Sequence, residues 1–286
     1  MRTAIIDAGG GQRAIYACGV LDYCMKKRIT FDVGIGVSAG SANLSSFIAR
    51  QKGRNYRFYT EFALRDDYMG IRNVRNKGCV LDLDYIYGTL SNKGGDAPLN
   101  YAAFRKSPMD FIAVATEAVS GGAKYFSKSD LKADHYDVLK ASCAIPHVCK
   151  PQSVNGIMYY DGALSDPLPV ELAFSLGCKR AVLLLSQPFG MPFDAAEDNK
   201  LAEKIRWQYP EIAKRLLMRS QAYQKELLLA QHYAQLGKLL IVAPDDDCGV
   251  TSLSRDTAAL EKLYEKGLQD GQQVAEYMQK GTLWED

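Results

Sequence analysis

The fold is decided by residues 31–50, which read FDVGIGVSAGSANLSSFIAR. Residues 31–37 are an apolar run typical of a buried strand, and residues 39–50 are rich in Ala, Ser, Leu and Phe, as expected for a packed helix. The turn between them is Gly36-Val37-Ser38-Ala39-Gly40, a G-x-S-x-G sequence. A strand-to-helix turn of this kind predicts a nucleophile elbow, in which Ser38 projects from the sheet at the start of a helix. The alternative is a chance match, since Gly and Ser are common residues.

A glycine-rich turn precedes this stretch. Residues 3–7 (TAIID) predict a first strand, and Asp7-Ala8-Gly9-Gly10-Gly11-Gln12-Arg13-Ala14 leads from it into a helix predicted over residues 13–26. Consecutive glycines expose backbone N–H groups that bind anions. In an acyl-transfer enzyme this turn would be an oxyanion hole. In a nucleotide-binding module without hydrolase activity the same turn would hold a phosphate, and Ser38 would only cap a helix.

A third motif is Tyr159-Tyr160-Asp161-Gly162-Ala163, which ends a strand predicted over residues 157–160. Functional residues of open α/β sheets stand at the carboxyl ends of strands. An ordinary Asp-Gly turn is the alternative, and Asp161 taken alone favours that alternative. The case for a functional Asp161 therefore depends on Ser38 and the glycine-rich turn.

Together these motifs resemble the patatin-like phospholipase family. The resemblance runs over residues 3–186 and includes Ala141-Ser142-Cys143-Ala144-Ile145-Pro146. It implies a three-layer α/β/α fold with a mainly parallel sheet, which would hydrolyse lipid esters with a Ser–Asp dyad. Ser38 would be the nucleophile and Asp161 the general base, and no cofactor or metal would be required.

The resemblance also assigns roles to the residues around the dyad. The oxyanion hole would come from the turn Gly9, Gly10 and Gly11, above all from the Gly10 and Gly11 amides, with the Ala39 amide as a further candidate. The residues that support the motifs are Arg13, Gly36, Gly40 and Gly162. A β-branched residue at Gly10 or Gly11 is expected to cost activity before stability.

Three positions raise alternatives. Ala14 stands where family members usually carry glycine, and its extra methyl group should leave the oxyanion hole intact. His147 follows Pro146 where a small residue is usual, and it either lines the active-site cleft or is a plain loop residue. His232 is a rival partner for Ser38, because Ser, Asp and His would then follow the chain order of α/β-hydrolases. Its position inside a predicted helix favours a solvated or core histidine instead.

The chain divides into a predicted catalytic α/β domain, residues 1–190, and a mostly helical C-terminal extension, residues 191–286. Within the first part, residues 51–108 show little regular pattern. The extension has one predicted strand, so its elements in order are a helical stretch over 199–236 broken at Pro210, a strand over 238–243 and a helix over 254–280.

Composition excludes several classes of protein. The 286 residues include 35 Lys and Arg against 33 Asp and Glu, and the resulting net charge of +2 gives no footprint for nucleic acid. A mean hydropathy of −0.19 and the lack of long apolar runs argue against a transmembrane helix. The seven cysteines are scattered without a CxxC pair, which predicts free thiols in a reducing, cytoplasmic compartment. The three histidines show no metal-ligand spacing.

Residues 199–236 carry basic residues among apolar ones, a pattern that suits transient contact with a lipid surface. The same pattern is also typical of a solvated helix face over a core. The expected partner is a lipid or small ester. Glycerophospholipid, neutral lipid, lysophospholipid and short soluble ester all fit the same dyad.

Overall fold

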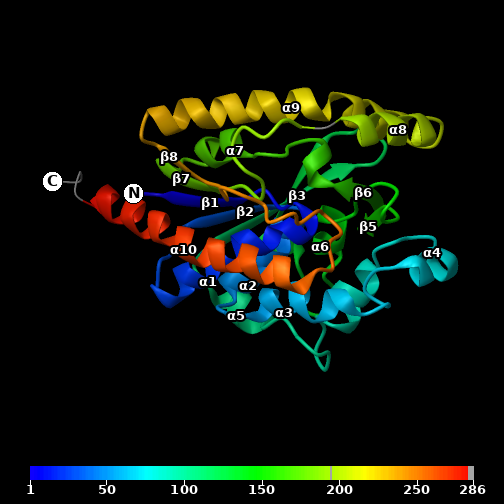
Figure 1. Ribbon diagram of the computed structural model, residues 1–286, viewed down its shortest axis with the longest axis horizontal. Helices are drawn as coiled ribbons and strands as arrows, with labels where there is room; N and C mark the ends of the chain where they lie inside the picture. The colour runs from blue at the N-terminus through cyan, green and yellow to red at the C-terminus, as the bar shows by residue number, and fades with distance from the viewer. Residues whose placement is uncertain (194, 283–286) are drawn as a thin grey trace.

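An eight-stranded sheet forms the centre of the computed structural model, which describes residues 1–193 and 195–282 (Figure 1). The strands are β1 (Thr3–Asp7), β2 (Val33–Val37), β3 (Asp110–Glu117), β4 (Ala123–Ser127), β5 (Gln152–Val154), β6 (Ile157–Asp161), β7 (Arg180–Leu184) and β8 (Leu239–Val242). Neighbours follow the order β5-β6-β3-β2-β1-β7-β8, and β4 pairs with β3.

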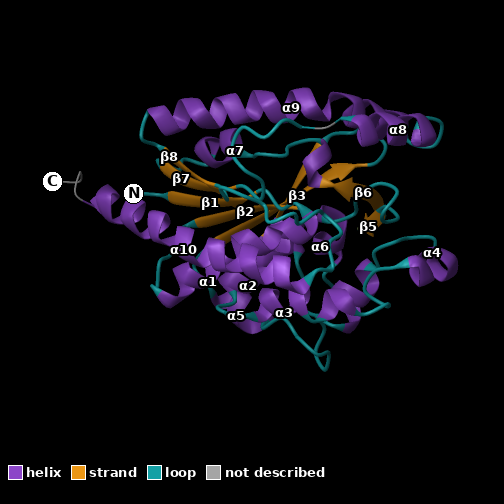
Figure 2. Cartoon of the chain, viewed as in Figure 1, coloured by secondary structure: helices purple, strands orange, loops and turns teal. Residues whose placement is uncertain are grey.

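Helices cover both faces of this sheet, which gives the three-layer α/β/α arrangement (Figure 2). In the view of Figure 1, α7, α8 and α9 lie above the sheet, and α1, α2, α3, α5 and α10 lie below it. The α-helices are α1 (Ile15–Lys26), α2 (Ala39–Ile48), α3 (Arg54–Thr60), α4 (Ile71–Lys77), α5 (Tyr101–Lys106), α6 (Asp137–Ser142), α7 (Val170–Ser175), α8 (Ala196–Ile205), α9 (Pro210–Gln235) and α10 (Thr257–Thr282).

The sheet is parallel at its centre and antiparallel at one side. Strands β3, β2, β1, β7 and β8 run parallel, and every residue of β2 is buried, as expected for a strand with helices on both faces. Strands β4 and β6 pair antiparallel with β3, and β5 pairs antiparallel with β6. The fold class expected from the sequence, a mainly parallel α/β sheet, is therefore confirmed.

The C-terminal segment adds to the sheet and to both helical layers. The predicted break at Pro210 is confirmed, because α8 ends at Ile205 and Pro210 occupies the first turn of α9. Strand β8 then pairs parallel with β7. Since β8 continues the same sheet, the division into residues 1–190 and 191–286 stays a prediction.

Helix α10 packs against α1 at glycine contacts. A Cβ on Gly267 would lie 2.0 Å from the backbone oxygen of Tyr16, and one on Gly271 would lie 2.6 Å from Cβ of Tyr23. Glycine lowers helix propensity, so the sequence pattern marks Gly271 as a weak point. The structure shows the compensating gain: the absent side chain lets the two helices approach closely. Among the described residues, no helix is both long and apolar enough to cross a membrane.

Candidate active site

Ser38 stands at the sharp turn between β2 and α2. Its backbone has φ 54° and ψ −133°, a combination that costs a non-glycine residue about 1–3 kcal/mol and that the surrounding contacts must hold in place. One such contact is the Ser38 N–H, which donates to Oγ of Ser142 at 3.1 Å. The side chain is nearly buried, with 6% of Ser38 exposed. This is the geometry predicted for a nucleophile elbow.

The glycines of the elbow are required by close backbone approach. A Cβ on Gly36 would lie 2.4 Å from Cα of Ser41, and a Cβ on Gly40 would lie 2.2 Å from the backbone oxygen of Asp7. No rotamer change relieves either contact, because the atoms that collide belong to the backbone. The two glycines flanking Ser38 in the motif therefore allow α2 to begin directly against the sheet.

We expect Gly40→Ala to destabilise the fold by about 1–3 kcal/mol, the usual cost of overpacking a close contact. The measurement is the melting temperature, followed by circular dichroism. The matched control is Gly88→Ala, because a Cβ on Gly88 meets nothing within 4 Å. Equal melting temperatures for the two variants would contradict the close approach of Gly40 to β1.

Asp161 reaches the elbow through the register of three strands. Val37 of β2 pairs with Val114 of β3, and the next residue, Ala115, pairs with Asp161 of β6. Ser38 and Asp161 therefore leave the sheet at the same level, separated only by β3. Strand β6 is antiparallel to β3, so Asp161 does not stand at the carboxyl end of a parallel strand, the position expected from the sequence.

The Asp161 carboxyl is buried and only partly satisfied. Oδ1 accepts a hydrogen bond from the Ala163 N–H at 2.9 Å, whereas Oδ2 has no hydrogen-bond partner among the described residues. Burial raises the pKa of Asp161 above its ordinary value of 3.8, and the neighbouring Ser38 hydroxyl, the Ala163 amide and the charge of Arg219 oppose that rise. The Asp161 carboxyl thus faces the Ser38 hydroxyl with one oxygen unoccupied, and such contacts commonly tighten only when substrate binds.

Two amides of the glycine-rich turn have no hydrogen-bond partner among the described residues. Gly9, Gly10 and Gly11 all have positive φ, at 70°, 119° and 61°, which few other residues adopt. The Gly9 N–H donates to Oδ1 of Asp7 at 2.9 Å, so it is already engaged. Within residues 1–193 and 195–282, no partner is recorded for the amides of Gly10, Gly11 and Ala39. These three amides therefore remain candidates for the predicted oxyanion hole.

The backbone of this turn also changes an expectation from the sequence. A Cβ on Gly11 would lie 2.4 Å from the backbone oxygen of Ser252, and one on Gly10 would lie 2.1 Å from Oγ of Ser186. Together with the positive φ values, these contacts mean that a β-branched residue at either glycine would cost stability as well as activity.

Asp7 and Asn43 hold the glycine-rich turn by hydrogen bonds, and neither residue has a role predicted from the sequence. Asp7 is fully buried, and burial raises its pKa to about 6. Its Oδ2 accepts from Nδ2 of Asn43 at 3.0 Å, and Asn43 also donates to the Ala14 carbonyl and accepts from the Tyr59 hydroxyl. An aspartate at the end of a buried strand was the available signal for Asp7. Ala14, which stands where glycine is usual, is fully buried, and its carbonyl accepts a hydrogen bond from Asn43.

A cavity of about 590 Å³ opens above the two candidate catalytic residues. Ser38, Asp161, Gly10, Gly11, Arg13 and His147 all line it. A second, narrow cavity of about 60 Å³ shares Ser38 and Gly11 with the first, and its wall is largely apolar and aromatic. The structure therefore brings together the predicted nucleophile, base and oxyanion donors, and it places His147 at the cavity.

His232 lies elsewhere. It stands near the end of α9, where its ring contacts Tyr233 edge-on at 5.9 Å between centroids, and it lines neither cavity. Gly162, by contrast, is close-packed beside the site, since a Cβ there would lie 2.3 Å from the Val114 oxygen.

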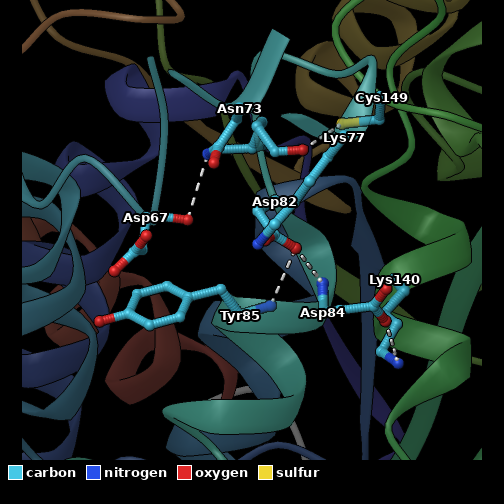
Figure 3. A network of polar contacts seen from close by, with 9 residues as sticks. Asp67, Asn73, Lys77, Asp82, Asp84, Tyr85, Lys140 and Cys149 are labelled. Carbon is cyan, nitrogen blue, oxygen red and sulfur yellow. Dashed lines mark hydrogen bonds and ion pairs between the residues drawn. The ribbon is translucent and has the colours of Figure 1, made fainter. Parts of the chain in front are cut away.

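A polar network holds the segment 78–85, whose side chains line both cavities (Figure 3). Oδ1 of Asp82 accepts hydrogen bonds from the backbone N–H groups of Asp84 and Tyr85, each at 3.0 Å. Oδ2 of Asp82 forms an ion pair with Lys77 of α4. Asp84 in turn pairs with Lys140 of α6 at 2.7 Å. The network fixes segment 78–85, which contributes one side chain to the larger cavity and two to the narrow one.

Comparisons with known proteins fit this geometry. A family model described as patatin-like phospholipase matches residues 8–174, and a second, described as a domain of unknown function (DUF6363), matches residues 209–281. The uncharacterized protein YjjU of Escherichia coli (strain K12) is 33% identical over 193 residues, covering 66% of this chain and 53% of YjjU. The chain thus spans about half the length of that relative.

Two weaker matches cover less of this chain or share less of its sequence. The uncharacterized NTE family protein Rv1063c of Mycobacterium tuberculosis (strain ATCC 25618 / H37Rv) is 37% identical over 68 residues, which are 24% of this chain and 18% of that protein. Among solved structures, VipD from Legionella pneumophila aligns with a TM-score of 0.45 at 12% identity, covering 96% of this chain and 66% of VipD.

Proposed function

Because this chain belongs to the patatin-like phospholipase family, we propose that it is a serine acyl hydrolase of lipid esters, of the phospholipase A or lysophospholipase type. The observation that carries the proposal is the register of β2, β3 and β6, which brings Ser38 and Asp161 together beneath a cavity with unpaired backbone amides. If Ser38 only capped α2, neither the buried carboxylate of Asp161 nor the cavity beside it would be needed.

The proposed cycle starts with Ser38 and Asp161. Asp161 accepts the Ser38 proton while Oγ attacks the ester carbonyl, and the Gly10, Gly11 and Ala39 amides stabilise the oxyanion. The tetrahedral intermediate collapses, the bond to the alcohol breaks, and the alcohol leaves with the proton from Asp161. Water then gives a proton to Asp161 and attacks the acyl-Ser38 ester, which releases a carboxylic acid and restores the serine.

The raised pKa of Asp161 supports its role as the base. An ordinary aspartate is a weak acceptor for a serine proton. Burial makes this carboxylate more basic, and the free Oδ2 has room for one proton. The oxyanion donors carry the remaining charge of the transition state in a site shielded from water.

The experiment that tests the proposal is incubation of the purified chain with a panel of acyl esters: a diacyl phospholipid, a lysophospholipid, a triacylglycerol and p-nitrophenyl butyrate. Release of free fatty acid from at least one lipid is expected, and it should saturate with substrate. Absence of acyl release from every ester by well-folded protein would exclude the hydrolase.

We also propose that the region around the turn between α8 and α9 touches an anionic lipid surface. Trp207 in this turn is 86% exposed, and the Arg206 guanidinium lies 5.0 Å from its ring centroid. Tryptophan beside a cation suits the boundary between lipid head groups and chains. Helix α8 also lines the larger cavity, so contact here would lie next to the entry for substrate.

Trp207→Ala is expected to weaken binding to liposomes that contain phosphatidylglycerol, and high salt should weaken it further. The measurement is flotation at low and high salt. Leu228→Ala is the matched control. Leu228 is exposed, as Trp207 is, but it stands on α9 several helical turns away from the α8–α9 turn. Equal flotation of both variants and wild type would contradict contact through Trp207.

A further inference from the structure

Two arginines line the same cavity as Ser38, and the Nε–H group of each lacks a partner in the part of the chain that the structure describes. Arg13 follows the glycine-rich turn, and Arg219 comes from α9. Within the described residues, Nε of Arg13 and Nε of Arg219 are both buried from solvent without any hydrogen-bond acceptor. A buried donor without an acceptor costs about 1–3 kcal/mol, and more when it is charged. Two such donors in one cavity therefore suit a ligand that brings its own acceptors.

The charges around the pair support the same conclusion. Burial lowers the pKa of Arg13, and the charge of Arg219 adds to the lowering, so the two guanidinium groups repel one another. Asp247 opposes this effect on Arg13. Asp198 neutralises Arg219 in part, through contacts of 3.3 and 3.5 Å from Nη1, which leave Nε unpaired.

The position of Arg219 is fixed by its surroundings. Its guanidinium lies 5.2 Å from the ring centroid of Phe193, and its charge lowers the pKa of Asp161. Lys200 and Lys204 of α8 line the same cavity. An anion held at this cluster would thus lie in the chamber that contains the proposed nucleophile.

We propose that Arg13 and Arg219 bind the phosphate ester of a glycerophospholipid whose acyl ester reaches Ser38. Guanidinium groups pair with phosphate oxygens in a bidentate, directional way, whereas a neutral lipid would leave both buried Nε donors unpaired. The inference rests on the proposed hydrolase function and adds to it the two residues that would select phosphate-bearing lipids over neutral ones. It also gives a role to α9, which lies beyond residues 8–174.

The first experiment measures binding without turnover. In Ser38→Ala protein, calorimetry would follow the binding of short-chain phosphatidylglycerol, inorganic phosphate and short-chain diacylglycerol. Phosphatidylglycerol is expected to bind at least about tenfold more tightly than diacylglycerol, and Arg219→Gln should weaken its binding at least about tenfold. Lys214→Gln, which removes a charge from an exposed part of the same helix, should not change binding. If Arg219→Gln fails to fold, Arg219→Lys replaces it in the same measurement. Lysine keeps the charge but loses the directional pairing with phosphate, so binding of phosphatidylglycerol should still weaken.

Two results of the binding experiment would overturn the inference. One is affinity for phosphatidylglycerol that does not depend on residue 219. The other is binding of inorganic phosphate at Arg219 together with equal affinities for phosphatidylglycerol and diacylglycerol, which would assign the arginines to a free phosphate instead of a lipid.

The second experiment uses turnover in the otherwise unchanged protein. The ratio of kcat/KM for short-chain phosphatidylglycerol to kcat/KM for p-nitrophenyl butyrate should fall at least about tenfold in Arg219→Gln and stay constant in Lys214→Gln. Cleavage of p-nitrophenyl butyrate with a ratio insensitive to residue 219 would overturn the phosphate subsite and leave the hydrolase standing. Failure to cleave any ester would overturn the hydrolase, while the binding experiment would still test the subsite.

Discussion

Ser38→Ala is expected to abolish ester hydrolysis, with a loss on the order of 10⁴–10⁶-fold in kcat, because the proposed cycle has no other nucleophile to form the acyl intermediate. The same substitution should abolish covalent labelling by a fluorophosphonate probe. The fold should persist, since alanine at φ 54° carries about the same backbone strain as serine and leaves no large cavity. Labelling followed by gel fluorescence, together with the melting temperature, measures both effects.

Ser45→Ala is the matched control for this experiment. Ser45 is a buried serine of α2, the helix that follows Ser38. Its hydroxyl donates to the Ala42 carbonyl at 2.7 Å, and it does not line either cavity. Its variant should keep labelling and hydrolysis. Labelling that survives in Ser38→Ala would contradict the proposed nucleophile. A well-folded wild type that is never labelled would favour the alternative of a phosphate-binding module without hydrolase activity.

The elbow could be predicted from sequence because its requirements are local. Residues 31–50 contain the buried strand, the helix and the two glycines on either side of Ser38. A Cβ at Gly36 or Gly40 would collide with residues that are near in the chain or in the adjacent strand. The break at Pro210 was predictable for the same reason, since proline removes an N–H and fits the first turn of a helix.

The rest of the site depends on pairings between distant segments. The antiparallel direction of β6 has no local signature, because an alternating or apolar run does not specify its neighbour. Arg219 reaches the cavity only because α9 packs across the sheet, and a basic residue in a helical pattern is usually solvated. Gly271 shows the same limit: its helical position predicts weakness, whereas its contact with Tyr23 gives the actual role.

The second large effect is expected for Asp161→Asn, which should lower kcat by about 10²–10⁴-fold. Asparagine keeps the size of the side chain and can still accept the hydrogen bond from the Ala163 amide, but it cannot take a proton from Ser38. The loss should therefore appear in kcat with little change in melting temperature. His232→Ala serves as the control and should retain activity, because His232 lines neither cavity. The opposite pattern, in which Asp161→Asn stays active and His232→Ala does not, would contradict the dyad.

The pH profile separates a base from a structural aspartate. A general base must be ionised, so the rate should be low in acid and should rise as pH increases through the pKa of Asp161. Because burial raises that pKa, the midpoint should lie above 3.8, the ordinary value for aspartate. In Asp161→Asn the residual rate should lose this inflection, since the group that titrates is gone. Measuring kcat against pH for both proteins tests the assignment. An inflection that persists unchanged in Asp161→Asn would assign the titration to another group and would remove the main chemical argument for Asp161 as the base.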